Sequence, residues 1–188
     1  IVGVTNLTLD CQGYRLTGTG SGNGIWVDYS STGVVIRNCD IYSFEHGMYY
    51  TGHGGVVEYN KVVDNHHGIR LSHGIDNDVR WNTGNDNSFG MYIDLSNNND
   101  IYENTFHRSD YGLYSNRAVG NYFIGNQLNL NNAQGIWFGY QSDNNFLWYN
   151  TANLNNGDGV YIQSGAVGND FYKNVLNRNG HRGIEDVA

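Results

Sequence analysis

The sequence predicts an all-β fold, a right-handed parallel β-helix of about eight coils of 21–24 residues, and two repeating columns carry this prediction. A Gly followed by an apolar residue recurs every 21 to 24 residues. A column of Asn residues has the same period and stands 8 or 9 residues before the next of these glycines. A shared period of this length is typical of solenoids, in which each repeat forms one coil. The Gly–apolar pairs are Gly24-Ile25, Gly47-Met48, Gly68-Ile69, Gly90-Met91, Gly112-Leu113, Gly135-Ile136, Gly159-Val160 and Gly183-Ile184.

Within each repeat, apolar residues alternate with other residues, which predicts three short strands per coil. The strand after each Gly points the residues at positions +1 and +3 inward, as with Ile69 and Leu71. Left-handed coils are usually built from six-residue units, and the chain shows none. Eight coils at about 4.8 Å each would form a rod of about 40 Å. The second strand is marked by Ile36, Val57, Val79, Ile101, Phe123, Leu147 and Phe171, and the third by Ile41, Val62, Gly84, Phe106, Leu128, Ala152 and Leu176.

The composition indicates one β domain and excludes several classes of protein. The 188 residues fit a single domain, with a divergent first coil over residues 1–23 and regular coils over residues 24–188. With 29 Asn and 26 Gly, both poor helix formers, the chain does not read as helical. The net charge is −8 and basic residues are scattered, so no nucleic-acid partner is expected. No apolar run approaches the roughly 18 residues of a transmembrane helix.

The Asn columns predict ladders of side chains that stack from coil to coil. Each Asn is expected to donate its amide N–H to the Asn carbonyl of the next coil. Asn also tolerates the left-handed backbone that a sharp corner needs. The first ladder is Asn60, Asn82, Asn104, Asn126, Asn150 and Asn174, with Cys39 in the same position one coil earlier. The second is Asn77, Asn99, Asn121, Asn145 and Asn169, and the third is Asn65, Asn87, Asn131, Asn155 and Asn179, interrupted by Ser109.

The two cysteines fall at nearly the same corner of the first two coils. Stacked Cα atoms of adjacent coils lie about 5 Å apart, so Cys11 and Cys39 are within disulfide range. A disulfide would imply an oxidising compartment. The alternative is a pair of buried thiols.

The opening of the chain resembles a known repeat family. The residues that carry the resemblance are Leu9-Asp10-Cys11-Gln12-Gly13-Tyr14, Gly24-Ile25 and Val35-Ile36-Arg37-Asn38-Cys39-Asp40-Ile41. The family is the right-handed parallel β-helix group typified by the periplasmic copper-binding accessory protein of nitrous oxide reductase. It also includes carbohydrate-binding and sugar-hydrolase modules and archaeal surface and adhesin-like proteins. The resemblance implies the fold and a secreted or surface setting, but no single activity, because lyases, hydrolases, epimerases and non-catalytic proteins share this scaffold.

An outward-facing row of aromatic side chains is the first candidate functional feature. It occupies the second position after each Gly, where six of seven residues are aromatic and Arg70 interrupts. Flat rings can stack on the faces of sugars, Tyr and Trp are enriched at protein interfaces, and stacked rings can also stabilise a sheet. The row therefore predicts a polysaccharide site, a protein contact or a purely structural stack. Its aromatic members are Trp26, Tyr49, Tyr92, Tyr114, Trp137 and Tyr161.

Histidines and carboxylates supply the candidate catalytic and metal-binding residues. His46 and His67 both precede a repeat Gly, so they should stack and could share Cu or Zn. In an active site, His67 or His73 would be the general base and Arg70 would stabilise an anion. The alternative is that these histidines are corner residues without chemistry.

Two pairs of carboxylates hold matching positions in different coils. Asp78 and Asp100 should stack and could hold Ca²⁺, the alternative being solvated turn residues. Asp28 and Asp94 lie three coils apart, roughly 14 Å, which is too far for a close carboxylate pair. This spacing disfavours a lyase or glycosidase site on that sheet, and no cofactor is firmly expected.

These features predict an extracellular or cell-surface structural or adhesive module, with the periplasm as a second setting. Self-association is expected through the coil ends, as in a filament or surface array, or through the aromatic face. The alternative function is a carbohydrate-active protein that binds or cleaves a polysaccharide along the aromatic row, with lyase, hydrolase or epimerase chemistry if it is an enzyme. Periplasmic metal handling through the histidines is a third interpretation.

Overall fold

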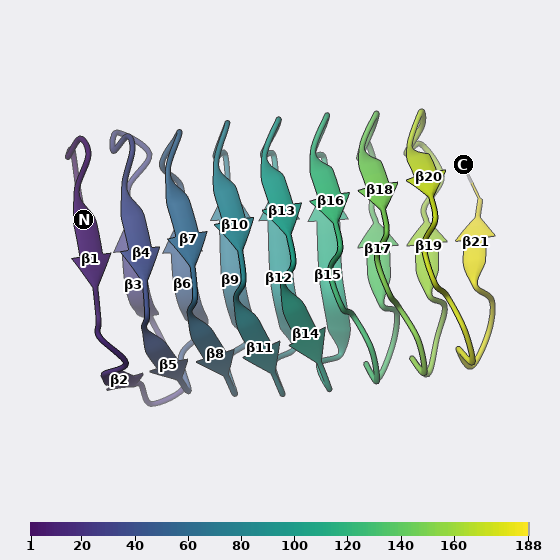
Figure 1. Cartoon of the computed structure of the whole chain (residues 1–188), viewed down its shortest axis with the longest axis horizontal. Helices are drawn as coiled ribbons and strands as arrows, with labels where there is room; N and C mark the ends of the chain where they lie inside the picture. The colour runs from purple at the N-terminus through teal and green to yellow at the C-terminus, as the bar shows by residue number, and fades with distance from the viewer. Residues whose placement is uncertain (188) are drawn as a thin grey trace.

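The computed structural model describes residues 1–187 as a stack of parallel β-coils (Figure 1). Each coil contributes a strand to up to three parallel sheets, which form the walls of the stack; two of the sheets run its length and the third covers only the first five coils. We call them sheet 1, sheet 2 and sheet 3, in the order in which the chain enters them. All regular structure assigned within residues 1–187 is β, so the predicted parallel β-helix is confirmed.

The strands are short; in the first five coils they enter sheets 1, 2 and 3 in rotation, and in the later coils they alternate between sheets 1 and 3. Sheet 1 contains β1 (Thr8–Asp10), β4 (Val35–Arg37), β7 (Val56–Glu58), β10 (Asp78–Arg80), β13 (Asp100–Tyr102), β16 (Tyr122–Ile124), β18 (Phe146–Trp148) and β20 (Asp170–Tyr172). Sheet 2 contains β2 (Arg15–Thr17), β5 (Asp40–Tyr42), β8 (Lys61–Val63), β11 (Thr83–Asn85) and β14 (Thr105–His107). Sheet 3 contains β3 (Asn23–Val27), β6 (His46–Tyr50), β9 (His67–Ser72), β12 (Phe89–Asp94), β15 (Tyr111–Asn116), β17 (Ile136–Phe138), β19 (Val160–Ile162) and β21 (Ile184–Asp186).

The core is a column of apolar side chains enclosed by the three walls. The inward positions expected from the sequence are buried, including Ile69 and Leu71 on β9. Large and small residues alternate where space is short: a Cβ on Gly84 would lie 2.5 Å from the Phe106 ring. Gly84 therefore makes room for Phe106, which is why a glycine stands in an apolar column.

Sheet 2 differs from the expectation of three strands in every coil, because it ends at β14. Later coils keep only isolated bridges, such as Gln127 with Thr151. The reason is that Asn129, Asn153 and Asn177 stack on one another in successive coils, at the position that Asn85 and His107 hold in earlier coils. The Oδ1 atoms of Asn129 and Asn153 accept the backbone N–H of the next coil, at 2.7 and 2.6 Å respectively. These side chains thus compete with strand pairing for the backbone donors.

The predicted Asn ladders bind adjacent coils together at the corners. Asn104 shows the pattern: its Nδ2 donates to Asn126 Oδ1 at 3.1 Å and to the Val79 carbonyl at 2.8 Å. Its own Oδ1 accepts both the backbone N–H and the Nδ2 of Asn82, each at 3.0 Å. Asn104 is fully buried, so these bonds satisfy polar groups that water does not reach.

The left-handed backbone at the corners lies one residue before the ladder Asn, and the expectation that the Asn itself adopts it was wrong. Positive φ is found at Tyr59 (55°), Trp81 (53°) and Glu103 (53°), each directly before an Asn of the first ladder. The ladder Asn must turn its side chain inward to reach the next coil. The preceding residue therefore makes the turn, and its own side chain projects outward.

The ladders persist where the coils change length. Successive members of the first ladder are 22 residues apart up to Asn126 and 24 apart from there to Asn174. The Asn126 Nδ2 still donates to Asn150 Oδ1 at 3.0 Å across this change. The extra residues enter on either side of the sheet 3 strand, which shortens from six residues in β15 to three in β17.

The first two coils are joined covalently as well. Cys11 and Cys39 form a disulfide with a Cα–Cα distance of 4.8 Å, so both cysteines are paired. Cys39 stands at the start of the first ladder, and its backbone N–H donates to Asn60 Oδ1 at 3.0 Å. The disulfide thus replaces the ladder amide at the point where the ladder begins.

The ladder predicts a large stability loss on removal of one central amide. Asn104→Ala leaves the buried backbone N–H of Asn82 without its acceptor and removes the bonds from Asn104 to Val79 and Asn126, so we expect about 3 kcal/mol of destabilisation. Calorimetry should show a melting temperature roughly 6–12 °C lower. The control Asn132→Ala removes an exposed amide that bonds only Asp110 and should melt within about 2 °C of the parent. Equal losses in both variants would contradict a special role for the ladder.

Candidate functional site

The outer face of sheet 3 carries the aromatic row as one continuous stack. Tyr92 and Tyr114 are parallel, with ring centroids 5.2 Å apart and 3° between planes. Trp137 stacks on Tyr114 at 5.7 Å and lies 4.3 Å from Tyr161. The register of the parallel strands produces this order, because Tyr92 pairs with Tyr114 and Tyr114 with Trp137. Trp26 is the most open member of the row at 42% exposure, and the other rings are half-buried by one another.

Arg70 continues the row as a flat cation. Its Cζ atom lies 5.0 Å from the Tyr49 ring centroid and 5.5 Å from that of Tyr92. Cation–π contacts of this kind hold the guanidinium plane between the two rings. The Nη1 atom reaches His46 Nε2 at 3.3 Å, whereas the buried Nε has no hydrogen-bond partner among residues 1–187. The buried Nε is out of reach of a ligand, so a ligand of the row would meet the terminal nitrogens of this half-buried guanidinium.

A second column of rings, which the sequence analysis missed, lies beside the row. Phe89 stacks on His67 at 5.0 Å and on Tyr111 at 5.2 Å, with nearly parallel planes. Simple alternation would point these residues away from the row. However, Gly90 and Met91 are both buried, so the strand is irregular at the Gly and Phe89 emerges on the same face as Tyr92. The sequence signal for this column is that His67, Phe89 and Tyr111 each stand directly before a repeat Gly.

His46 and His67 stack as expected, and their contact defines their protonation. Their Nδ1 atoms are 3.1 Å apart, so one ring donates to the other. Because Arg70 can only donate to His46 Nε2, His46 carries its proton on Nδ1 and donates it to His67. Burial lowers the pKa of His67 to about 3, with smaller electrostatic contributions from His66, His46 and Arg70. Burial, followed by Arg70, also lowers the pKa of His46. Both rings are therefore neutral at pH 7.

The described residues do not fit a resident metal ion at either predicted position. Across residues 1–187, no three His, Cys, Asp or Glu side chains gather closely enough to hold one. The His46 and His67 lone pairs are engaged by each other and by Arg70, a cation, and both cysteines are in the disulfide. Asp78 and Asp100 stack as strand partners, but Arg80 already pairs with Asp78 at 3.3 Å. Burial and the Asp78 charge raise the pKa of Asp100.

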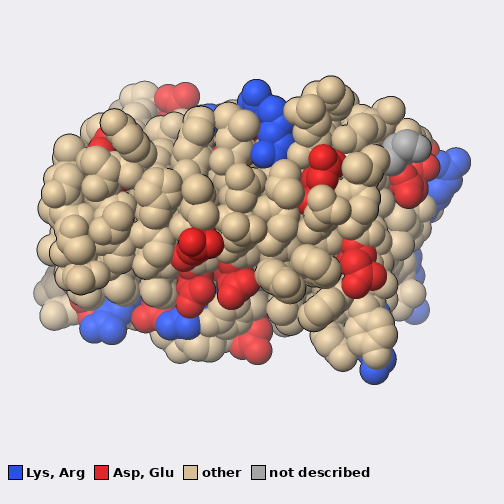
Figure 2. Space-filling view, turned by 90° about the horizontal axis from the view of Figure 1, so that it is seen from above, with Lys and Arg blue, Asp and Glu red and all other residues tan. Residues whose placement is uncertain are grey.

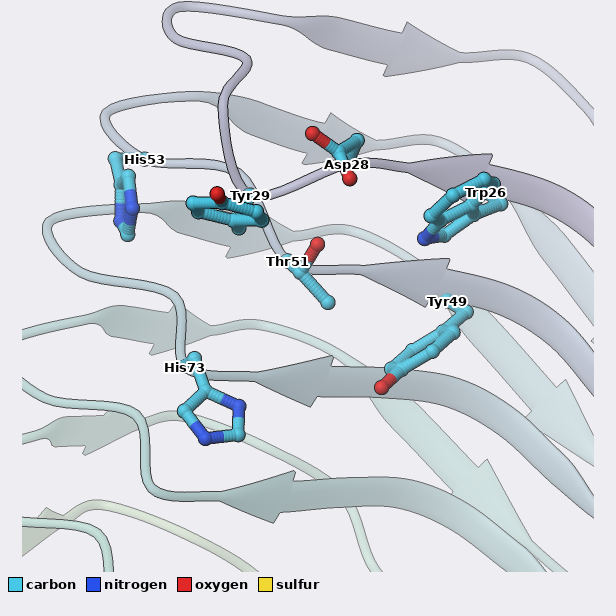
Figure 3. Close-up of a pocket in the computed structure, with 7 residues that line it drawn as sticks. All are labelled: Trp26, Asp28, Tyr29, Tyr49, Thr51, His53 and His73. Atoms are coloured by element: carbon cyan, nitrogen blue, oxygen red, sulfur yellow. The ribbon is translucent and has the colours of Figure 1, made fainter. Parts of the chain in front are cut away.

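A hollow of about 430 Å³ opens at the Trp26 end of the row, where β3, β6 and β9 end (Figure 3). Its volume is within the range of small-ligand pockets. Side chains from three successive coils converge on it: Trp26, Asp28, Tyr29, Tyr49, Thr51, His53 and His73. Their polar atoms provide both donors and acceptors beside two rings of the row.

The polar groups of the hollow are partly fixed by neighbours. His53 Nδ1 accepts the Ile75 backbone N–H at 3.2 Å, which leaves its Nε2 as the donor. Ser30 bonds to Asp28 through both its hydroxyl and its backbone N–H, and these bonds lower the pKa of the Asp28 carboxyl. Ser72 Oγ lies 3.0 Å from His73 Nδ1. The hollow is thus polar on one side and aromatic on the other.

The candidate catalytic residues do not form one cluster. His67 lies at the beginning of β9, while His73 directly follows its end and lines the hollow. Arg70 lies between them and contacts His46. Asp28 and His53, which the sequence analysis did not select as site residues, join His73 instead. His53 and His73 come from adjacent coils, and that spacing was the available signal.

Charged side chains are sparse on the face of the molecule that Figure 2 shows. Figure 2 shows acidic side chains in separate small groups on a mostly uncharged face. The Asp94 carboxylate, at the end of β12, is partly neutralised. It pairs with Arg117 at 3.1 Å and accepts a hydrogen bond from the Asn116 side chain at 2.9 Å. No helix in residues 1–187 is long and apolar enough to cross a membrane.

Comparison with known families identifies the scaffold. The family model described as periplasmic copper-binding protein (NosD) matches residues 5–184, nearly the whole chain. The chain belongs to the NosD family. Membership confirms the resemblance seen at the N-terminal repeats. No curated protein is similar enough in sequence to count as a relative.

Several solved structures are similar to this NosD-family chain. Periplasmic alginate epimerase AlgG matches with a TM-score of 0.69 and 16% identity, over 91% of this chain and 45% of that one. The A-module of Azotobacter vinelandii mannuronan C-5 epimerase AlgE4 gives 0.59 and 12%, over 82% and 56%. Dettilon tailspike protein gives 0.65 and 18%, over 87% and 43%. The chain spans roughly half of these structures, and at such identities the likeness shows the fold alone.

The buried histidine pair predicts acid sensitivity. The unfolded chain binds a proton on His67 below its ordinary pKa of 6.5, whereas the folded chain does so only near 3. Stability contributed by neutral His67 is therefore complete above pH 6.5 and falls as the pH drops toward 3. We expect about 2 kcal/mol of this loss at pH 4.5.

Melting curves at pH 7.5 and pH 4.5 check this prediction. In His67→Phe, which copies the Phe89 ring of the next coil, the difference between the two pH values should shrink by several degrees. His181→Phe, at an exposed histidine, should keep the parent's difference. An unchanged difference in His67→Phe would show that another group causes the acid loss.

Proposed function

We propose that this chain is a β-solenoid module that binds an extended polysaccharide along the aromatic row of sheet 3. The observation that carries the proposal is the unbroken line of stacked planar groups from Tyr49 to Tyr161, running along the axis of the coils. A polymer with a regular repeat matches a surface with a regular repeat. Sugar rings have apolar faces that stack on aromatic side chains, and their hydroxyl groups need polar partners at the edge of the row.

The hollow at the Trp26 end favours a ligand over a purely structural stack. Cross-strand stacking alone would stabilise the sheet equally well without a hollow. Here the row opens into a space where Asp28, His53 and His73 offer hydrogen-bonding groups next to Trp26. Aromatic walls with a few convergent polar groups are typical of small-ligand sites. The hollow would hold one end of the bound polymer.

Arg70 makes an acidic sugar the favoured ligand of the row. A guanidinium binds a carboxylate through its N–H donors, and the half-buried Arg70 gives only its Nη1 atom to a neighbour among residues 1–187, which leaves its other terminal nitrogen for a ligand. Two of the similar folds belong to proteins named as alginate or mannuronan epimerases, whose named polymers are polyuronates. This likeness supports polysaccharide chemistry on the scaffold and assigns no reaction to this chain.

We place the module outside the cytosol, in the periplasm or on the cell surface. The Cys11–Cys39 disulfide supports an oxidising compartment. The name of the family, periplasmic copper-binding protein, agrees with this setting.

Binding of a polyuronate tests the proposal. Trp26→Ala should weaken binding of alginate or polygalacturonate about tenfold, because it removes the most exposed stacking ring. Melting should change little, since this side chain is 42% exposed. Isothermal titration calorimetry and ligand quenching of Trp fluorescence give the readout.

The matched control is Tyr14→Ala, at a ring that is 76% exposed and lies outside the row. Its affinity should equal that of the parent. Absence of polysaccharide binding by the parent, or equal losses in both variants, would overturn the proposal.

Self-association through the aromatic row is a second candidate, because Tyr and Trp side chains are enriched at protein interfaces and Trp26 is 42% exposed. Sedimentation velocity over a range of concentrations tests it, and a monomer at every concentration would contradict it.

A further inference from the structure

The outer face of sheet 1 changes character along the stack. In β4, β7 and β10 its outward side chains include Arg37, Glu58 and Arg80, whereas from β13 onward they become aromatic. This second surface lies on a different wall from the row of sheet 3. Its outward residues in the later coils are Asp100, Tyr102, Tyr122, Ile124, Phe146, Trp148, Asp170 and Tyr172.

The charged half of this wall is occupied with its own contacts. Arg37 pairs with Asp10 at 2.9 Å, and Arg80 pairs with Glu58 at 2.9 Å. Arg80 also donates to the Tyr102 hydroxyl at 2.6 Å, where the aromatic half begins. The charges in the early coils therefore satisfy one another and offer little to a ligand.

The aromatic half is built around Trp148. Tyr122 stacks on Phe146 at 4.6 Å, and Trp148 meets both edge-on, at 6.0 and 5.6 Å. The Trp148 ring is held in place, since its Nε1 donates to Asp170 Oδ2 at 3.1 Å. The indole thus stands as a fixed ridge on the wall.

A hollow lies on each side of this ridge. One is lined by Asp100, Tyr102, Tyr122, Ile124 and Trp148. The other is lined by Trp148, Tyr149, Asp170 and Tyr172. Each hollow therefore combines aromatic rings with one carboxylate, and Trp148 is common to both.

The chemistry of the two hollows selects a neutral, hydroxyl-rich ligand. Carboxylate oxygens accept hydrogen bonds from hydroxyl groups and repel anions. Lys173, the basic group nearest the second hollow, lies over the Tyr172 ring at 4.9 Å and the Tyr149 ring at 5.7 Å. Rings for stacking, acceptors for hydroxyl groups and two hollows divided by a ridge fit a short sugar chain better than a flat protein surface.

We propose that sheet 1 carries a second, independent sugar site, in which a neutral oligosaccharide lies across Trp148 with sugar units in the hollows on either side. The site differs from the row of sheet 3 in its ligand, because each hollow is lined by a carboxylate, while the nearby cations are engaged: Arg80 by Glu58 and Lys173 by the Tyr149 and Tyr172 rings. The module would then hold two glycans of different charge on two of its walls.

Calorimetric titration of the full chain with cellohexaose, xylohexaose and mannohexaose tests the site. At least one of these neutral probes should bind, and Trp148→Ala should weaken that binding at least tenfold. Tyr172→Ala, at a ring that is 47% exposed, should also weaken it and provides a second variant should Trp148→Ala unfold.

The chain offers a matched control in Trp81→Ala. Trp81 also lies on the sheet 1 side and also donates its indole N–H to a carboxylate, Glu103, but it lines neither hollow. Its neutral-probe affinity should equal that of the parent. Trp26→Ala should likewise leave neutral binding unchanged while weakening polyuronate binding, so the two sites can fail separately.

Three outcomes would overturn this second site. The first is that none of the three neutral probes binds the parent. The second is that Trp26→Ala or Trp81→Ala reduces neutral binding as much as Trp148→Ala does. The third is that Trp148→Ala converts an associated parent into a monomer in sedimentation without changing sugar affinity, which would make this surface an interface between copies.

Discussion

The hydrogen bonding of buried Asn side chains between coils is the interaction on which this structure depends. A chain that turns a corner every few residues leaves backbone donors without strand partners. In this protein an amide from the coil before or after bonds these donors, as Asn104 does for Asn82. Each Asn donates to one neighbouring coil and accepts from the other. Sliding any single coil relative to its two neighbours would therefore break hydrogen bonds on both sides of it. The ladders therefore hold every coil in a single register.

A fixed register also determines how surface groups can be arranged. A residue at a given place in one coil lies directly beside its equivalent in the next, about 5 Å away. Functional groups are therefore extended in columns along the axis, and one substitution per coil is enough to change a column from charged to aromatic. The histidine pair, the stacked row and the two hollows beside Trp148 all form because equivalent positions of successive coils lie side by side.

Most of the fold could be predicted from the sequence, because the repeat period and the Asn columns are properties of sequence position alone. Sheet 2 was predicted to run too far, since an apolar residue such as Leu128 indicates burial but does not reveal that the Asn129 side chain competes for strand bonds. The row was placed correctly on one face. Phe89 was missed because strict alternation does not anticipate the irregular strand at Gly90. The Trp148 surface was missed because the apolar column marks the buried Leu147, while the outward positions beside it change residue type from coil to coil.

The two-residue lengthening of the later coils has a consequence for the evolution of this scaffold. The added residues enter on both sides of the sheet 3 strands, yet Asn126 still reaches Asn150 and Asn121 still reaches Asn145. Segments between ladders can therefore grow without altering the corners that hold the stack. Insertions at these points would border the aromatic row of sheet 3. Natural variation could thus reshape the rim of that row while the interior of the solenoid stays the same.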